Sequence, residues 1–268
     1  AYPEVPKGHG EVDWPDEKRV KKAPQPSSGK RETTGEGKKE AENDEGGKRK
    51  VDEGLRTYRS PDLTPFEQLL CAVLLSKPIS HTLGLRSIRT VLSPPYSFGT
   101  PKALDEAGNE GRREALWEAR TQHKEKTAEQ LGSLVEGVRK LTGTDDEDRA
   151  IQLAALLEHA KAANGHREAV DTVRDNITQN IKGVGPTGAD IFLRQVQRHK
   201  GWECVFPFAD HRALDVAARL GLLTDSKDEE AGAKRLASLV GQDRTKFVAL
   251  LDILIGLDLE KKTDQVVK

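Results

Sequence analysis

Hydrophobic positions divide the chain into two unlike parts. Residues 1–54 contain no Leu, Ile or Phe, whereas the residues that follow carry Leu, Ile, Val and Ala at the density of a folded core. The first part cannot bury enough apolar surface to offset its chain entropy, so we predict a disordered, charged tail. The second part, residues 55–268, is long enough to form a domain with a large core.

Apolar residues in this second part recur at helical spacing, and strand-like alternation is almost absent. The stretch "TPFEQLLCAVLLS" offers Thr64 as an N-cap, Pro65 at the first helical position and Glu67 three residues after the cap. We therefore predict an all-α fold. The pattern favours about ten helices, at 65–76, 81–92, 111–120, 126–141, 146–162, 167–181, 186–198, 211–220, 229–240 and 244–257.

Charge and composition narrow the function classes. The net charge is −1, which is unlike a domain that binds polyanions by bulk attraction, so any nucleic-acid contact must come from local patches. No apolar run approaches the roughly 18 residues of a membrane span, and we expect a soluble protein that is not secreted. The basic clusters "KRVKK" and "GGKRK" fit nuclear import, and equally a solvated tail.

The two cysteines, Cys71 and Cys204, both lie among apolar neighbours. Two thiols are too few for a four-cysteine zinc or iron–sulfur site, and they do not indicate a disulfide framework. We expect both to be small buried hydrophobic residues.

The stretch "KGVGPTG" joins two predicted helices. Gly183 and Gly185 permit a tight hairpin, Val184 is expected to pack beneath it, and Pro186 suits the first turn of the next helix. Such a hairpin exposes backbone N–H groups that can hold a phosphate without reading base identity. A plain turn between two helices is the alternative.

Three segments in order resemble the helix-hairpin-helix DNA glycosylase superfamily, which includes endonuclease III and the adenine- and thymine-mismatch glycosylases. They are "TPFEQLLCAVLLSKPIS", "IKGVGPTGADIFLRQV" and "VFPFADHRALDVAARLGL", and the similarity covers about residues 60–257. The resemblance implies two helical lobes with a groove between them. One lobe is expected from residue 63 to about 179, and the preceding residues with the final helices would complete the other.

The resemblance places Asp210 on the family's catalytic aspartate. A carboxylate suits that role, because it stabilises an oxocarbenium-like transition state and activates water. Asp210 also fits an ordinary helix N-cap, and the two roles are compatible.

Bifunctional relatives carry a lysine where this chain has Thr187, so the similarity implies a monofunctional glycosylase. Lys77 and Lys182 lie near the motifs, as a substitute amine, as phosphate contacts or as surface charges.

The resemblance also suggests contact residues. In the wedge loop, Pro78 stands where the family has Gln or Arg, so Lys77, Ile79 or His81 is expected to fill the gap left by a flipped base. Phe206 and Phe208 are expected to pack the loop that carries Asp210. The segment "LWEARTQHKEKTAEQL" nominates a base pocket, although Trp117 also suits a core anchor and His123 an exposed helix end. The predicted DNA contacts are Lys77, Pro78, Lys182, Gly183, Val184, Gly185, Gly188 and His211, and the predicted base pocket is Trp117, Gln122 and His123.

Cofactors and partners follow from the same similarity. No cysteine follows Cys204, so we expect no iron–sulfur cluster, while a monovalent cation at the hairpin fits the family. The expected partner is double-stranded DNA, bound by a monomer in the nucleus, or in the nucleoid of a prokaryote. A base-excision glycosylase is the favoured function. The alternatives are a DNA-binding protein that has lost catalysis and a helical interaction module with a coincidental hairpin.

Overall fold

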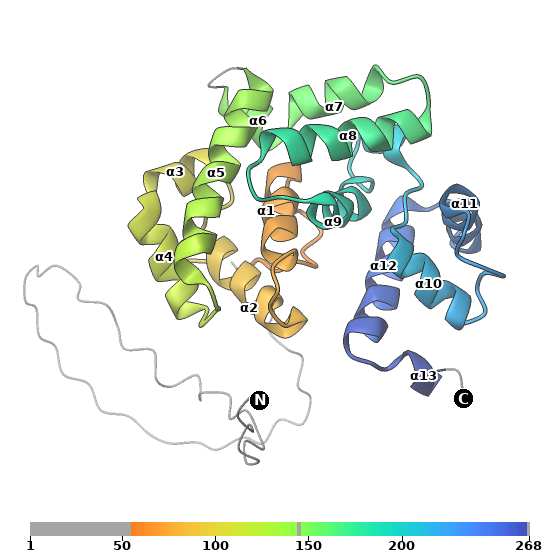
Figure 1. Cartoon of the computed structure of the whole chain (residues 1–268). Helices are drawn as coiled ribbons and strands as arrows, with labels where there is room; N and C mark the ends of the chain where they lie inside the picture. Colours follow the sequence, from red (N-terminus) through yellow and green to blue (C-terminus); the bar gives the residue numbers. More distant parts are fainter. Residues whose placement is uncertain (1–54, 144–145, 267–268) are drawn as a thin grey trace, which may run out of the picture. The chain divides into compact units, whose positions relative to one another are not determined.

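A computed structural model describes residues 55–143 and 146–266 of the chain (Figure 1). These residues form thirteen α-helices and one short 3-10 helix, with no β-strand among them, so the all-α prediction is confirmed. None of the helices in these two ranges is long and apolar enough to cross a membrane. The tail predicted for residues 1–54 lies outside the described residues.

The helices follow one another along the chain with short connections. In order they are α1 (Pro65–Leu75), α2 (His81–Leu92), α3 (Pro101–Glu106), α4 (Gly108–Glu118), α5 (Lys124–Thr142), α6 (Glu147–Ile151), α7 (Ala154–Lys161), α8 (His166–Asn180), α9 (Pro186–Val196), the 3-10 helix η2 (Trp202–Val205), α10 (His211–Arg219), α11 (Glu229–Leu239), α12 (Arg244–Leu259) and α13 (Thr263–Val266).

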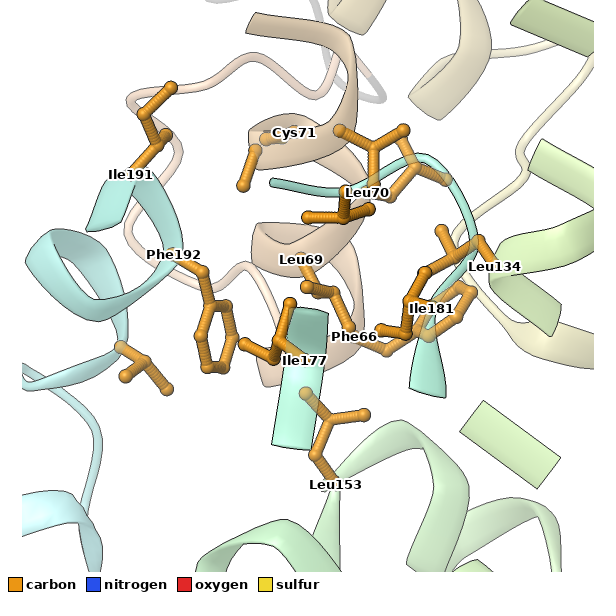
Figure 2. Packing of buried hydrophobic residues seen from close by; sticks show 14 of the residues in the cluster. Phe66, Leu69, Leu70, Cys71, Leu134, Leu153, Ile177, Ile181, Ile191 and Phe192 are labelled. Atoms are coloured by element: carbon orange, nitrogen blue, oxygen red, sulfur yellow. The ribbon is translucent and has the colours of Figure 1, made fainter. Parts of the chain in front are cut away.

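Helix α1 is the centre of the larger apolar core. The predicted capping box is present: the Thr64 hydroxyl accepts from the N–H of Glu67 at 3.2 Å, and the Glu67 carboxylate accepts from the N–H of Thr64 at 2.7 Å. The helix packs against α2, α5 and α9. Figure 2 shows Phe66, Leu69 and Leu70 of α1 among apolar side chains of α5, α8 and α9, which include Leu134, Ile177 and Phe192.

Most helix ends lie within three residues of the prediction, and the set of helices differs from the prediction in three places. The span predicted at 146–162 is two helices, because Leu153 adopts a left-handed conformation with φ of 50° and ends the first one. The short helices α3 and α13 were not predicted, since four to six residues show too little periodicity to detect. Helix α3 depends on its cap, in which Thr100 accepts from the N–H of Ala103 at 3.1 Å.

Two clusters of buried side chains divide the described residues. The first extends from Tyr58 to Phe208, and the second is formed by Ala209 and helices α10, α11 and α12. The boundary predicted near residue 179 is therefore wrong. Helix α9 packs its apolar face on α1, and Phe192 meets the buried Trp202 edge-on with ring centroids 5.6 Å apart. The first core thus continues through α9 and η2.

The two cysteines are both free thiols. Cys71 is fully buried in α1, as predicted, and burial raises the pKa of its thiol. The expectation of burial is wrong for Cys204, which is only partly buried, because η2 buries Trp202 and Val205 and leaves the side chain between them less covered.

Candidate functional site

The turn between α8 and α9 is a tight glycine hairpin. Gly183 has φ of +81°, a left-handed conformation, and Gly185 is the N-cap of α9 in an extended conformation. Within the described residues, no hydrogen bond uses the N–H groups of Gly183, Gly185 or Thr187. Three unused donors at the start of an eleven-residue helix form a setting that favours an anion.

Two of the predicted DNA contacts are buried and shape the hairpin instead. Val184 is 4% exposed and packs under the turn, as its apolar side chain requires. Gly188 is buried in the first turn of α9, where an added Cβ would lie 2.8 Å from Cγ1 of Val184. The N–H groups of both residues already donate within the hairpin, to the carbonyls of Ile181 and Gly185. Gly185 and Lys182 are exposed, as a contact requires.

Two carbonyl groups at the hairpin turn already have partners. The carbonyl of Ile181 accepts from the N–H of Val184 at 3.1 Å, and the carbonyl of Gly183 accepts from the side-chain amide of Gln130. These oxygens are the ligands that the turn would offer to a monovalent cation, which favours hard oxygen ligands. The cation stays a prediction.

A cavity of about 410 Å³, here called the first cavity, brings together residues of both cores. It contains three of the predicted site residues: Asp210, Thr187 and His211. The wall combines apolar and charged side chains. The apolar side chains are Leu75, Ile79, Leu85, Ile191, Ile255 and Leu259, and the polar ones are Tyr58, Arg59, His81, Thr187, Asp190, Arg194, Asp210, His211, Arg212 and Asp252. A volume of this size is within the range of small-molecule sites.

Asp210 is held at both carboxylate oxygens. Oδ1 accepts from the N–H of Ala213 at 2.8 Å, which makes Asp210 the N-cap of α10, and Oδ2 accepts from the guanidinium of Arg194. The side chains of Arg194 and Asp210 are 6% and 11% exposed, so the ion pair is nearly buried. The N-cap role predicted from the sequence is confirmed, and it points the carboxylate at the cavity.

A buried polar network continues behind Arg194. Oδ1 of Asp252 accepts from the side-chain amide of Gln195 at 2.6 Å and lies 3.5 Å from the hydroxyl of Tyr58. Burial alone would lower the pKa of Arg194, but Tyr58, Asp210 and Asp252 outweigh burial and raise it. Burial also raises the pKa of Asp252. Arg194 thus stays charged and links the two aspartates.

Burial shifts the pKa values of two further groups in the first cavity, Asp190 and His81. It raises the pKa of Asp190, although Arg174 donates to this carboxylate at 2.9 Å and opposes the shift. It lowers the pKa of His81. His211 is more exposed and lies 3.1 Å from the carboxylate of Asp215, one turn further along α10.

A second cavity, of about 450 Å³, lies on the other side of the wedge loop. Four of the predicted DNA contacts line it: Lys77, Pro78, Lys182 and Gly183. Ile79 lines both cavities, so the loop separates them. Gln122 and His123 also line the second cavity, where they do not meet Asp210. The predicted base pocket and the predicted catalytic acid are thus in different cavities.

Trp117 lines neither cavity and is 60% exposed. Its alternative role as a core anchor is wrong, because α4 buries Arg112, Ala115 and Leu116 and turns the next residue outward. The ammonium of Lys124 lies 4.1 Å from its ring centroid. His123 is exposed and immediately precedes α5, as the alternative for that residue predicted.

The loop before Asp210 is fixed by its aromatic side chains, as predicted. Phe206 meets Phe247 edge-on at 5.4 Å, and Phe208 is buried. The backbone N–H and carbonyl of Phe208 both bond the side-chain amide of the buried Gln197, at 2.9 and 2.8 Å. The backbone that delivers Asp210 is therefore rigidly placed.

The sequence pattern did not indicate Tyr58, Asp252 or the role of Arg194. A signal for Arg194 was present: Thr187, Asp190 and Arg194 are three and four residues apart, so they share one face of α9. An arginine on a face that also carries Ile191 indicates a buried charge. Tyr58 and Asp252 are 194 residues apart, and no local pattern connects them.

Comparisons of this chain with protein-family models, curated proteins and solved structures find no match.

Proposed function

We propose that this protein is a monofunctional DNA glycosylase that hydrolyses the N-glycosidic bond of a flipped damaged or mispaired base. The observation that carries the proposal is the carboxylate of Asp210 in the wall of a cavity that Thr187, from the hairpin helix, also lines. The hairpin and the acid come from successive α-helices, α9 and α10. A phosphate on the hairpin would bring its nucleotide close to this cavity.

The hairpin supplies binding without sequence preference. The unused N–H groups of Gly183, Gly185 and Thr187 can donate to a backbone phosphate. Gly185 is exposed and has no atom within 4 Å of the position of an added Cβ, so this part of the turn is open to a ligand. Binding of this kind is sensitive to salt, because it neutralises phosphate charge.

Asp210 supplies the chemistry. As the C1′–N bond breaks, its electron pair leaves with the base, and positive charge develops on the sugar. The ionised carboxylate stabilises that charge, and the oxygen of a water molecule then bonds to C1′. The water proton passes to the carboxylate or to the departing base. The products are a free base and an abasic sugar.

The absence of a suitable amine supports the monofunctional assignment. Among the described residues, the side chains that line the first cavity include no lysine. The hydroxyl of Thr187 cannot form an imine with the sugar aldehyde, and guanidinium groups stay protonated. Cleavage of the backbone by a lyase step is therefore not expected.

A DNA-binding protein without catalysis is the second candidate, and the Arg194–Asp210 ion pair favours it. The guanidinium neutralises part of the charge that Asp210 would offer to the transition state. A fixed cation next to the carboxylate suits a structural ion pair. The two candidates share the hairpin and differ only in the chemistry at Asp210.

A panel of duplex oligonucleotides separates the candidates. The duplexes contain uracil, thymine opposite guanine, oxidised bases or alkylated bases, and alkali reveals abasic sites after incubation. We expect cleavage of at least one duplex by the wild type and a loss of about 100-fold or more for Asp210→Asn. Asp215→Asn is the matched control, because Asp215 is on the same helix and does not line the first cavity. Equal activity of Asp210→Asn and wild type would refute the catalytic assignment.

A further inference from the structure

The second cavity has an excess of positive charge, unlike the first cavity. Its wall holds Lys77, Lys126 and Lys182 against a single acid, Glu129. The first cavity, in contrast, balances three arginines with three aspartates. Apart from the hydrogen bond that Lys77 donates to Gln130, the ammonium groups of these lysines make no ion pair or hydrogen bond with any described residue. The cavity therefore presents uncompensated positive charge.

The charged form of Lys77 is destabilised in this cavity. Its side chain is half-buried, and burial together with the nearby Lys126 lowers its pKa to about 8. Both effects disfavour the ammonium form, and an anion between the lysines would reverse them. The environment of Lys77 is thus one that an anionic ligand would stabilise.

Gln130 fixes the geometry of the cavity. Its side-chain oxygen accepts from the ammonium of Lys77, and its amide donates to the carbonyl of Gly183. The residue is buried in α5, so one side chain sets both the wedge-loop lysine and the hairpin. Lys126 and Lys182 reach the same cavity from the first turn of α5 and from the hairpin.

We propose that the second cavity binds a phosphate group between Lys77, Lys126 and Lys182. A phosphate offers several acceptor oxygens to three ammonium donors, and charge-assisted hydrogen bonds of this kind are strong. The group comes either from a phosphodiester of DNA or from a free phosphate. This site needs no chemistry at Asp210 and so goes beyond the proposed function.

Amine labelling of the full chain tests the site. A low concentration of acetic anhydride acetylates free amines, and mass spectrometry gives the labelling rate of Lys77 at pH 7. A bound phosphate that raises the pKa of Lys77 by about one unit lowers its free-amine fraction, and hence this rate, about tenfold. The probes are inorganic phosphate and an undamaged DNA duplex, each compared with chloride at equal ionic strength.

Two variants make the test specific. Lys126→Gln combined with Lys182→Gln removes two exposed cavity cations and should abolish the protection of Lys77. Lys124→Gln is the matched control, because it removes the same charge two residues away, where the side chain lies over Trp117 outside the cavity. This control should keep the protection.

Each outcome has a distinct meaning. Protection by inorganic phosphate that the double variant loses supports the site and assigns a free phosphate as ligand. Protection by the duplex alone, again lost in the double variant, supports the site and assigns a phosphodiester. Absence of protection by either probe, or equal protection in the double variant, overturns the proposal. Asp210→Asn should keep the protection, so a failed glycosylase assay leaves this result standing.

Discussion

Arg194, in the second helix of the hairpin motif, donates to the carboxylate of Asp210 at the start of the next α-helix. The ion pair joins the predicted phosphate-binding turn to the predicted catalytic loop. It also connects the two apolar cores, since Arg194 belongs to α9 and Asp210 caps α10. A nearly buried pair of this kind stabilises the fold only while both charges are present.

Removing Arg194 alone should strongly destabilise the protein. Arg194→Leu leaves Asp210 buried without its cation, and we expect the free energy of unfolding to fall by about 3–5 kcal/mol. Arg194→Leu combined with Asp210→Asn removes both charges and should be more stable than Arg194→Leu alone. Urea unfolding of the wild type, both single variants and the double variant gives the coupling energy. Additive effects would show that the ion pair carries no coupling.

Alanine substitutions at the two hairpin glycines should have different effects, one on stability and the other on duplex binding. Gly183→Ala forces a side chain into a left-handed conformation and should cost roughly 1–2 kcal/mol of stability. Gly185→Ala meets no atom within 4 Å and has an ordinary extended conformation, so its melting temperature should stay near that of the wild type. Its added methyl group should still weaken duplex binding, because it keeps a phosphate from the backbone.

Fluorescence anisotropy with a labelled duplex at two salt concentrations measures that binding. Gly143→Ala is a control for the general cost of a side chain at a left-handed glycine, since Gly143 ends α5 and lines neither cavity. Duplex affinity of Gly185→Ala equal to that of the wild type would remove the hairpin from the DNA interface.

An amine placed at Thr187 should create lyase chemistry. Thr187 is exposed in the first turn of α9 and lines the first cavity, so Thr187→Lys brings a primary amine close to the position of an abasic sugar. With a duplex that contains an abasic site, borohydride should trap a covalent complex for Thr187→Lys and not for the wild type. Equal trapping by the wild type would mean that another lysine already acts as the amine.

His199 should make the fold sensitive to acid. Burial, and then Arg198 and Arg244, lower its pKa to about 4 from an ordinary value of 6.5. Between these values the unfolded chain binds a proton that the folded chain does not, so stability present above pH 6.5 is lost as the pH falls toward 4. One proton corresponds to a slope of at most about 1.4 kcal/mol per pH unit.

Urea midpoints at several pH values, for the wild type and His199→Gln, isolate this contribution. The variant should show a shallower loss between pH 6.5 and 4, whereas replacement of the exposed His159 by Gln should not. Parallel pH profiles for wild type and His199→Gln would contradict the assignment.

The local features of the chain were determined by its sequence. The start of α1 is determined by Thr64, Pro65 and Glu67, and the start of α10 by Asp210, because a cap depends on residues within one turn. The hairpin is equally local: Gly183 takes a conformation that few other residues adopt. The periodicity of Leu, Val and Ile likewise sufficed for the all-α class.

Only the tertiary structure decided which predicted site residues share a cavity. Thr187 and Asp210 meet in the first cavity, while Gln122 and His123 lie with Lys77 in the second, and Trp117 faces outward. The sequence also did not reveal the partners of Arg194 or the pairing of Tyr58 with Asp252. The reason is physical: helix formation depends on neighbours within a few residues, whereas cavities and buried ion pairs depend on how distant helices pack.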